Sequence, residues 1–332
     1  MARKASTLMF KRKLVDLGEV SKDSSLRGIF VEEGFSADMV SKYIHRGFRQ
    51  DATEYARRYQ NVAHFEALLR DALGTRAGWT EWGAPVDILD LGCGAGNTVI
   101  PLCRLFPNAR VIACDLSVEL LMLLAGSLSA DAAERVTLVQ MNAEELDLDE
   151  GSMDLVVGGA ILHHLYSPDR TLAAAARILR KGGVALFFEP FETGSILLRI
   201  VWARMLSDPR AKDIEPDVRT FLAGMIQEYD LRKGTDKSSE MYSALEDKWL
   251  FSREYFEHHA RDLGFSNLQI YSLINDEYPF TLKTEVVLRT GIARARDALP
   301  AWAWHMVRQH EEYFSAGGRQ DLLIEAGVLL RK

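Results

Sequence analysis

A glycine-rich segment, LDLGCGAGN at residues 89–97, restricts the folds open to this 332-residue chain more than any other part of it. Gly92, Gly94 and Gly96 occupy every second position, and Asp90 stands two residues before the first of them. An apolar run precedes the segment and a helical pattern follows it. This arrangement is typical of a loop that joins a strand to a helix beneath a nucleotide, and it predicts an α/β fold.

Residues 81–190 have the alternating pattern that such a fold requires. Short apolar runs alternate with helical patterns, and the runs are apolar throughout, as expected for strands covered on both faces. Together with two later runs they predict a Rossmann-like, doubly wound, mainly parallel sheet of seven strands. The expected strands are 86–91, 110–115, 136–142, 153–159, 184–190, 266–274 and 324–332.

Helical patterns surround this core. Residues 1–80 are predicted to be a helical N-terminal segment that forms part of a lid, with one helix over 52–74. Residues 191–250 are predicted to be a helical cap insertion. Residues 251–332 are expected to complete the sheet around a second helical insertion at about 275–320.

Composition excludes several classes of partner. Hydrophobic residues make up 48% of the chain and charged residues 26%, as in soluble globular proteins, and no apolar run is long enough to span a bilayer. The formal net charge of -7 gives no general attraction to nucleic acid or to an anionic membrane, so neither partner is expected. Three cysteines, an odd number, favour a reducing, cytoplasmic compartment. The sequence does not decide the oligomeric state, and a homo-oligomer is one of the alternatives.

The spacing of the glycines separates two kinds of nucleotide loop. A dinucleotide loop follows G-x-G-x-x-G, but here the third glycine position is Asn97 and the glycines follow G-x-G-x-G. The carboxylate of Asp90 at the strand end would repel a pyrophosphate and favour a cationic ligand. S-adenosylmethionine carries an ammonium and a sulfonium group and no phosphate, so it fits this loop better than a nicotinamide dinucleotide does.

Residues that end the next two strands fit the nucleoside of the same ligand. Asp115 lies 21 residues after Gly94, where a carboxylate accepts hydrogen bonds from ribose hydroxyls. Leu116 beside it is expected on the adenine face. The Asn142 side chain is predicted to accept from the adenine amino group, and the Ala143 backbone N–H to donate to the ring.

Five segments in order, LDLGCGAGN, ACDLS, QMNAEEL, SMDLVVGGAILHHL and LRKGG, resemble the motifs of small-molecule class I S-adenosylmethionine-dependent methyltransferases. The resemblance covers roughly residues 84–190 and implies S-adenosyl-L-methionine as cofactor and S-adenosyl-L-homocysteine as product, with no metal. The family usually has aspartate at the position of Asn142. The expected cofactor contacts are Asp90, Gly92, Cys93, Gly94, Asp115, Leu116, Asn142, Ala143 and Gly159, with Arg58 and Tyr59 from an N-terminal helix.

Methyl transfer to oxygen or carbon also requires removal of a proton from the acceptor. His163 and His164 follow the fourth strand, where a base is expected, and the resemblance favours His164; the alternative is that a ring only packs or caps. Glu189 ends the fifth strand as either a substrate contact or a structural carboxylate.

No metal site is predicted, because adjacent histidines on a helix cannot both face one ion and no cysteine or carboxylate completes a set. The His258–His259 pair is expected on a solvated helix face.

Large aromatic side chains in the two insertions indicate the class of acceptor. Trp202, Tyr242, Tyr278 and Trp302 are, with Glu189, the expected substrate contacts, and they favour an apolar or aromatic small molecule. The predicted function is methylation of a small organic acceptor, at oxygen, in specialised metabolite biosynthesis. Methylation at carbon or nitrogen, methylation of nucleic acid or protein, and a non-catalytic cofactor-binding subunit are the alternatives.

Overall fold

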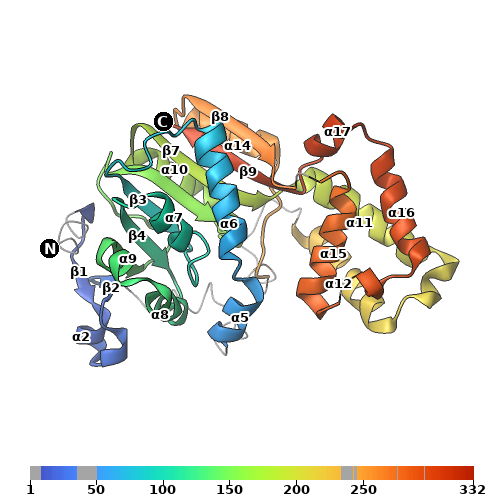
Figure 1. Ribbon diagram of the computed structural model, residues 1–332, viewed down its shortest axis with the longest axis horizontal. Helices are drawn as coiled ribbons and strands as arrows, with labels where there is room; N and C mark the ends of the chain where they lie inside the picture. Colours follow the sequence, from blue (N-terminus) through green and yellow to red (C-terminus); the bar gives the residue numbers. More distant parts are fainter. Residues whose placement is uncertain (1–8, 36–50, 233–241, 243–244, 275, 295) are drawn as a thin grey trace.

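The computed structural model describes residues 9–35, 51–232, 242, 245–274, 276–294 and 296–332. An α/β core carries a bundle of helices on one side (Figure 1). The core confirms the predicted Rossmann-like α/β fold. Within the described residues, however, its sheet has nine strands and not the expected seven, in the order β1-β2-β5-β4-β3-β6-β7-β9-β8.

Seven of these strands form the sheet that the sequence predicts. They are β3 (Asp87–Leu91), β4 (Arg110–Asp115), β5 (Val136–Gln140), β6 (Met153–Gly159), β7 (Leu179–Pro190), β8 (Asn267–Ser272) and β9 (Glu325–Arg331). Strands β3 to β7 run parallel, and β9 is antiparallel to both of its neighbours. The strand order reverses at β3, which lies between β4 and β6, and ligands of such sheets bind at the carboxyl ends of the strands there.

The two additional strands come from the N-terminal segment, which was expected to be helical. Strand β1 (Leu14–Asp16) pairs antiparallel with β2 (Ile29–Glu32), and β2 pairs parallel with β5 at the sheet edge. Ile29 and Val31 are buried against the core. The short β-branched and aromatic run IFV, preceded by Gly28, is a strand signal that the polar surroundings obscured.

Helices cover both faces of the sheet. Alternate residues of β3 supply the two apolar cores, since Ile88 packs in one cluster and Leu89 in the other. The predicted helix over 52–74 is divided into α5, α6 and the π-helical turn η3, because Asn61 leaves helical geometry and caps α6 by accepting from the His64 N–H at 3.2 Å. The helices and turns around the sheet are α2 (Leu17–Ser21), η2 (Ser24–Leu26), α5 (Ala52–Tyr59), α6 (Val62–Leu69), η3 (Arg70–Arg76), α7 (Val99–Leu105), α8 (Val118–Ser127), α9 (Ala130–Arg135), η4 (Leu162–His164), α10 (Pro168–Ile178) and α14 (Arg253–Asp262).

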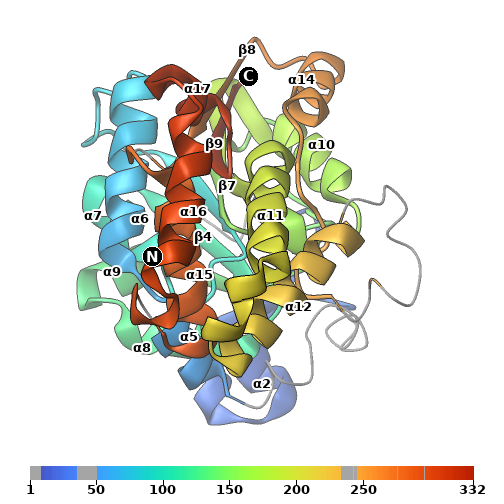
Figure 2. The same cartoon turned by 90° about the vertical axis from the view of Figure 1, so that its right-hand side faces the viewer.

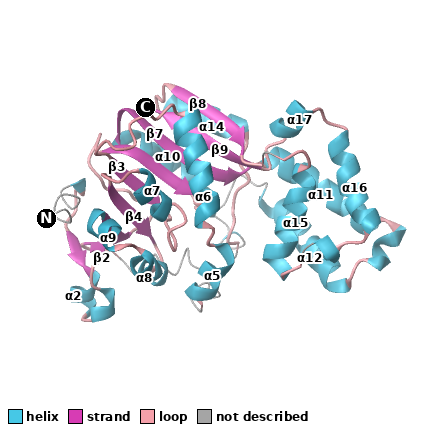
Figure 3. Cartoon of the chain, in the orientation of Figure 1, coloured by secondary structure: helices cyan, strands magenta, loops and turns pink. Residues whose placement is uncertain are grey.

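Two insertions that are far apart in the sequence form one helical bundle, here called the cap (Figure 2). The first contributes α11 (Glu192–Ser207), η5 (Pro209–Asp213) and α12 (Pro216–Arg232), and the second α15 (Pro279–Ile292), η6 (Arg296–Ala298), α16 (Ala301–Glu312) and α17 (Ala316–Asp321). The cap has an apolar core of its own. Strands are confined to the α/β core (Figure 3). None of the helices described is both long and apolar enough to cross a bilayer.

Candidate cofactor and active site

The glycine loop leaves β3 with a backbone that favours glycine. Gly92 has a φ angle of 62° and Gly96 one of 100°. A Cβ atom at Gly92 would lie 2.5 Å from the side chain of Ile161, so a larger residue would also clash. At Gly94 the nearest described atom to such a Cβ would be 3.9 Å away, which leaves room for a ligand to approach the backbone.

Two acidic side chains flank this loop. Asp115 accepts hydrogen bonds from the backbone N–H groups of Gly94 and Ser117, both at 2.8 Å. Asp90 is fully buried; its Oδ2 accepts from the Thr98 hydroxyl, and its Oδ1 has no hydrogen-bond partner among the described residues. Burial raises the pKa of Asp90 to about 8, helped by the charge of Asp115, and burial also raises the pKa of Asp115. A cation beside this pair would favour the charged form of both groups.

The side chain that ends the next strand offers a donor where an acceptor was expected. Asn142 is buried, and its Oδ1 accepts from the Glu144 N–H at 3.0 Å. Its Nδ2 has no partner in the part of the chain that the structure describes. The free atom therefore suits an acceptor nitrogen of an adenine ring and not the amino group. Leu116 is half-buried and Ala143 buried at the same sheet edge.

Asn97, which replaces the third glycine, anchors the junction between α5 and α6 over the glycine loop. Its Nδ2 donates to the Tyr59 carbonyl at 3.2 Å, and its Oδ1 accepts from the Asn61 N–H at 2.7 Å. Gln60 adds a bond from its side chain to the Ala95 carbonyl at 2.9 Å. Tyr59 therefore meets the loop through its backbone.

The other predicted cofactor residues have structural contacts. Arg58 donates to backbone carbonyls at the end of α15, including Gly291 at 2.9 Å, so it joins α5 to the cap. Cys93 is buried, and its N–H donates to the Cys114 carbonyl at 3.0 Å. A Cβ at Gly159 would lie 2.8 Å from Thr98, which shows that this glycine serves close packing.

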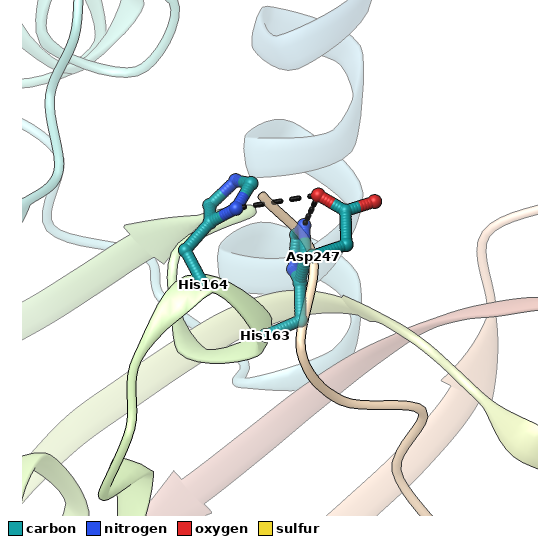
Figure 4. Close-up of side chains that lie close together, drawn as sticks. All are labelled: His163, His164 and Asp247. Carbon is teal, nitrogen blue, oxygen red and sulfur yellow. Dashed lines mark ion pairs between the residues drawn. The ribbon is translucent and has the colours of Figure 1, made fainter. Parts of the chain in front are cut away.

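The two histidines after β6 lie on η4, with the carboxylate of Asp247 beside them (Figure 4). Glu189, at the end of β7, lies 2.6 Å from His163 Nδ1 and accepts from the N–H of Leu162 at 2.8 Å. Glu189 is 1% exposed, which favours the structural carboxylate over the substrate contact of the two alternatives. Asp247 Oδ1 lies 3.5 Å from His163 Nε2 and 3.3 Å from His164 Nδ1.

Asp247 overturns one premise of the sequence analysis, which held that no carboxylate completes a set with the histidines. It lies on the segment that returns from the cap, and that segment is held against η4 because the N–H groups of Lys248 and Trp249 donate to the His163 carbonyl at 2.7 and 3.2 Å. His163 and His164 also lie on a 3-10 turn, where adjacent side chains can converge on one carboxylate.

The two histidines differ in charge. Burial alone would lower the pKa of His163, but the carboxylates of Glu189 and Asp247 outweigh it and raise the pKa to about 10. Burial and the charge of His163 lower the pKa of His164 to about 4. At pH 7 the pair is therefore one imidazolium and one neutral imidazole.

The aromatic residues expected to bind substrate build the cap instead. Trp202 is fully buried in the cap core, where its indole N–H donates to Thr284 at 3.0 Å, and the hydroxyl of the buried Tyr242 donates to the Leu231 carbonyl at 3.0 Å. Tyr278 and Trp302 are half-buried and lie under the guanidinium groups of Arg308 and Arg210, at 4.5 and 4.6 Å from the ring centroids.

A family model described as a methyltransferase domain matches residues 88–183, the segment that carries the glycine loop, Asp115, Asn142 and the histidines. This segment is a class I S-adenosylmethionine-dependent methyltransferase domain. The chain is 30% identical over 175 residues to a malonyl-[acyl-carrier protein] O-methyltransferase of Methylococcus capsulatus, which corresponds to 52% of this chain and 60% of that protein. The chain spans less than two thirds of the length of this and other curated relatives.

Solved structures share the fold at low sequence identity. A protein assigned as a sarcosine dimethylglycine methyltransferase from Galdieria sulphuraria gives a TM-score of 0.52 at 14% identity and covers 85% of this chain and 98% of that one. A phosphoethanolamine N-methyltransferase from Haemonchus contortus, solved with S-adenosylhomocysteine, gives 0.50 at 14% identity and covers 91% of this chain and 61% of that one. These matches establish the fold.

Proposed function

We propose that this methyltransferase binds S-adenosyl-L-methionine at the carboxyl ends of β3, β4 and β5 and transfers its methyl group to a small organic acceptor, with oxygen as the expected atom. The observation that carries the proposal is the pair Asp90 and Asp115 beside the open backbone of Gly94, with one buried Asp90 oxygen lacking a partner among the described residues. A cationic ligand satisfies this oxygen, whereas a pyrophosphate would be repelled.

Three residues at this edge suit the nucleoside of the cofactor. Asp115 would accept from the ribose hydroxyls, and the free Nδ2 of Asn142 would donate to the adenine ring. Leu116 would pack against the adenine face. The cofactor supplies an electrophilic methyl group, and the protein's part is to hold an acceptor in line with it, which is mainly a matter of proximity and orientation.

The acceptor is proposed from weaker signals. One relative is named for O-methylation, and two structural neighbours are named for methylation of amine-containing compounds. These names support a small acceptor. The choice of oxygen as the methylated atom rests on the sequence analysis alone. His164 stays the proposed base. Its pKa of about 4 makes it a weak proton acceptor at neutral pH, so we expect it to contribute at the lower end of the usual range, about 100-fold in rate.

Calorimetry with S-adenosyl-L-homocysteine tests the cofactor site. Asp115→Ala should abolish binding, because it removes the acceptor for the ribose and the bond that holds Gly94. Asp131→Ala is the matched control, since that exposed aspartate pairs only with Arg135 on the surface of α9 and should bind normally. His164→Ala should bind normally and turn over more slowly.

Two results would contradict the proposal. One is tight uptake of NADH with no uptake of S-adenosyl-L-homocysteine, which would return the loop to the dinucleotide class. The other is normal binding by Asp115→Ala. Salt-dependent binding to RNA, together with methyl transfer to it, would favour the nucleic-acid alternative over a small acceptor.

A further inference from the structure

Three side-chain atoms that commonly bind metals meet beside the cofactor edge (Figure 4). His163 Nε2, His164 Nδ1 and Asp247 Oδ1 all lie within 4.8 Å of one another, and the carboxylate oxygen is 3.5 and 3.3 Å from the two nitrogens. Ligands bound at about 2.1 Å to one ion are about 3.0 Å apart at a right angle and about 3.4 Å apart at the tetrahedral angle. Both oxygen–nitrogen distances lie in or close to this range, and an ion would take the place of the proton on His163 Nε2.

A second carboxylate fixes the ring that such an ion would need. Glu189 is buried and lies 2.6 Å from His163 Nδ1, so the opposite nitrogen, Nε2, is directed toward Asp247. Glu189 is itself held by the backbone N–H groups of Ile161 and Leu162 at 3.1 and 2.8 Å. Metal-binding histidines almost always have their other ring nitrogen bonded in this way, which sets both tautomer and orientation.

We propose that His163, His164 and Asp247 form a binding site for one divalent transition-metal ion. Two imidazoles and one carboxylate favour zinc, iron, cobalt or nickel, whereas magnesium and calcium prefer oxygen ligands. Three protein ligands leave coordination positions open, as in catalytic metal sites. If the proposed function holds, an ion at this edge would coordinate an acceptor atom and lower its pKa, and His164 would then serve as a ligand in place of a base.

Arg232 limits how Asp247 takes part. Its guanidinium donates to Asp247 Oδ2 at 2.8 Å, so Oδ1 is the oxygen left to face both rings. The Glu246 carbonyl accepts a hydrogen bond from His164 Nδ1 at 3.0 Å, so an ion bound at Nδ1 would require the other tautomer of this ring, with its proton on Nε2. The competing arrangement is an ion-paired cluster in which Asp247 only orients the two histidines without binding a metal.

Metal-free protein titrated with cobalt(II) separates these two arrangements. We expect visible d–d absorption bands to appear at one equivalent, zinc(II) to displace the cobalt, and magnesium(II) to leave the bands unchanged. His164→Ala and Asp247→Asn alter partly exposed side chains and should each remove the bands. Glu189→Gln should weaken cobalt binding about 10- to 100-fold, as changes behind a metal-binding histidine generally do.

The chain offers a matched control in its other adjacent histidine pair. His258 lies on the surface of α14 and pairs with Asp262 at 2.9 Å, so His258→Ala should leave the cobalt spectrum unchanged. Asp115→Ala should also leave it unchanged, which separates this site from the cofactor site.

If no cobalt bands appear while S-adenosyl-L-homocysteine still binds, the metal site is wrong and the proposed function still stands. Bands that persist in His164→Ala and Asp247→Asn would also overturn it, because the ion would then lie elsewhere. Normal cobalt binding with no uptake of the homocysteine product would instead count against the cofactor assignment alone.

Discussion

Asp90 and Asp115 lie where the protein interior disfavours their charge. Burial is the largest cause of the raised pKa in each case, and the charge of Asp115 adds to the effect at Asp90. The hydrogen bonds from Thr98 and from the loop backbone only partly offset burial. A cation bound beside this pair would stabilise the charged form of both carboxylates. The electrostatics of these two residues therefore favour a cationic cofactor.

We expect binding of S-adenosyl-L-methionine to release protons near pH 7. With a pKa of about 8, Asp90 is mostly protonated in the ligand-free protein, and a neighbouring cation lowers that pKa. Since the complex then holds fewer protons, affinity should rise as the pH increases from about 6 to 7.5. Calorimetry in two buffers of different ionisation enthalpy measures the protons released. Asp90→Asn should bind more weakly and show buffer-independent heats; buffer-independent heats in the unaltered protein would contradict this account.

At the scale of elements, the junction between α5 and α6 is the feature that closes the cofactor edge. It touches the glycine loop through the side chains of Asn97 and Gln60, while Arg58 joins α5 to the end of α15 in the cap. Residues of α5 lie on the surface, and none of those described is fully buried. An element held mainly by a few polar contacts is expected to open more easily than the core does.

Asn97→Ala should loosen this junction while leaving the sheet intact. The variant loses two hydrogen bonds between the loop and the helix junction, each worth about 0.5–1.5 kcal/mol. Amide hydrogen exchange should therefore speed up over residues 52–61, and affinity for the homocysteine product should fall. Asn108→Ala, which removes a bond to the Gly83 carbonyl away from the site, is the control and should do neither. Unchanged exchange in Asn97→Ala would show that other contacts hold α5.

On the scale of the whole molecule, the side chains pack in two bodies, the α/β core and the cap. The sheet with its two apolar cores carries the glycine loop, and the cap has a separate core that includes Trp202. Polar contacts connect them, among them the ion pairs between Lys283 of α15 and Glu325 of β9 and between Arg232 of α12 and Asp247. The histidine cluster lies at this connection.

Trp202→Ala tests the division. Removing this buried ring should destabilise the protein by about 3–5 kcal/mol, because it leaves a cavity in the cap core and removes the hydrogen bond from the indole to Thr284. Denaturant unfolding measures the loss, and calorimetry should show binding of the homocysteine product within a few-fold of normal. Ile200→Ala, on the exposed side of α11, should change stability by less than about 0.5 kcal/mol. A folded Trp202→Ala protein that cannot bind the product would place the cap in the cofactor site.

The sequence by itself determined the α/β core and where its nucleotide edge lies. Its signals are the alternating apolar runs, the positive-φ glycines and Asp115. Each of them depends on local backbone geometry or on short spacing along the chain, so it can be recognised from the order of the residues. Strand β2 could also have been found, since the run IFV after Gly28 is a local signal.

Only the tertiary structure decided the contacts between remote segments. It joined two insertions into one cap, buried Trp202 there, turned Arg58 toward α15, and brought Asp247 to His163. The spacing of residues along the chain does not predict these contacts, because they depend on how separate helices and strands pack once the apolar cores have formed.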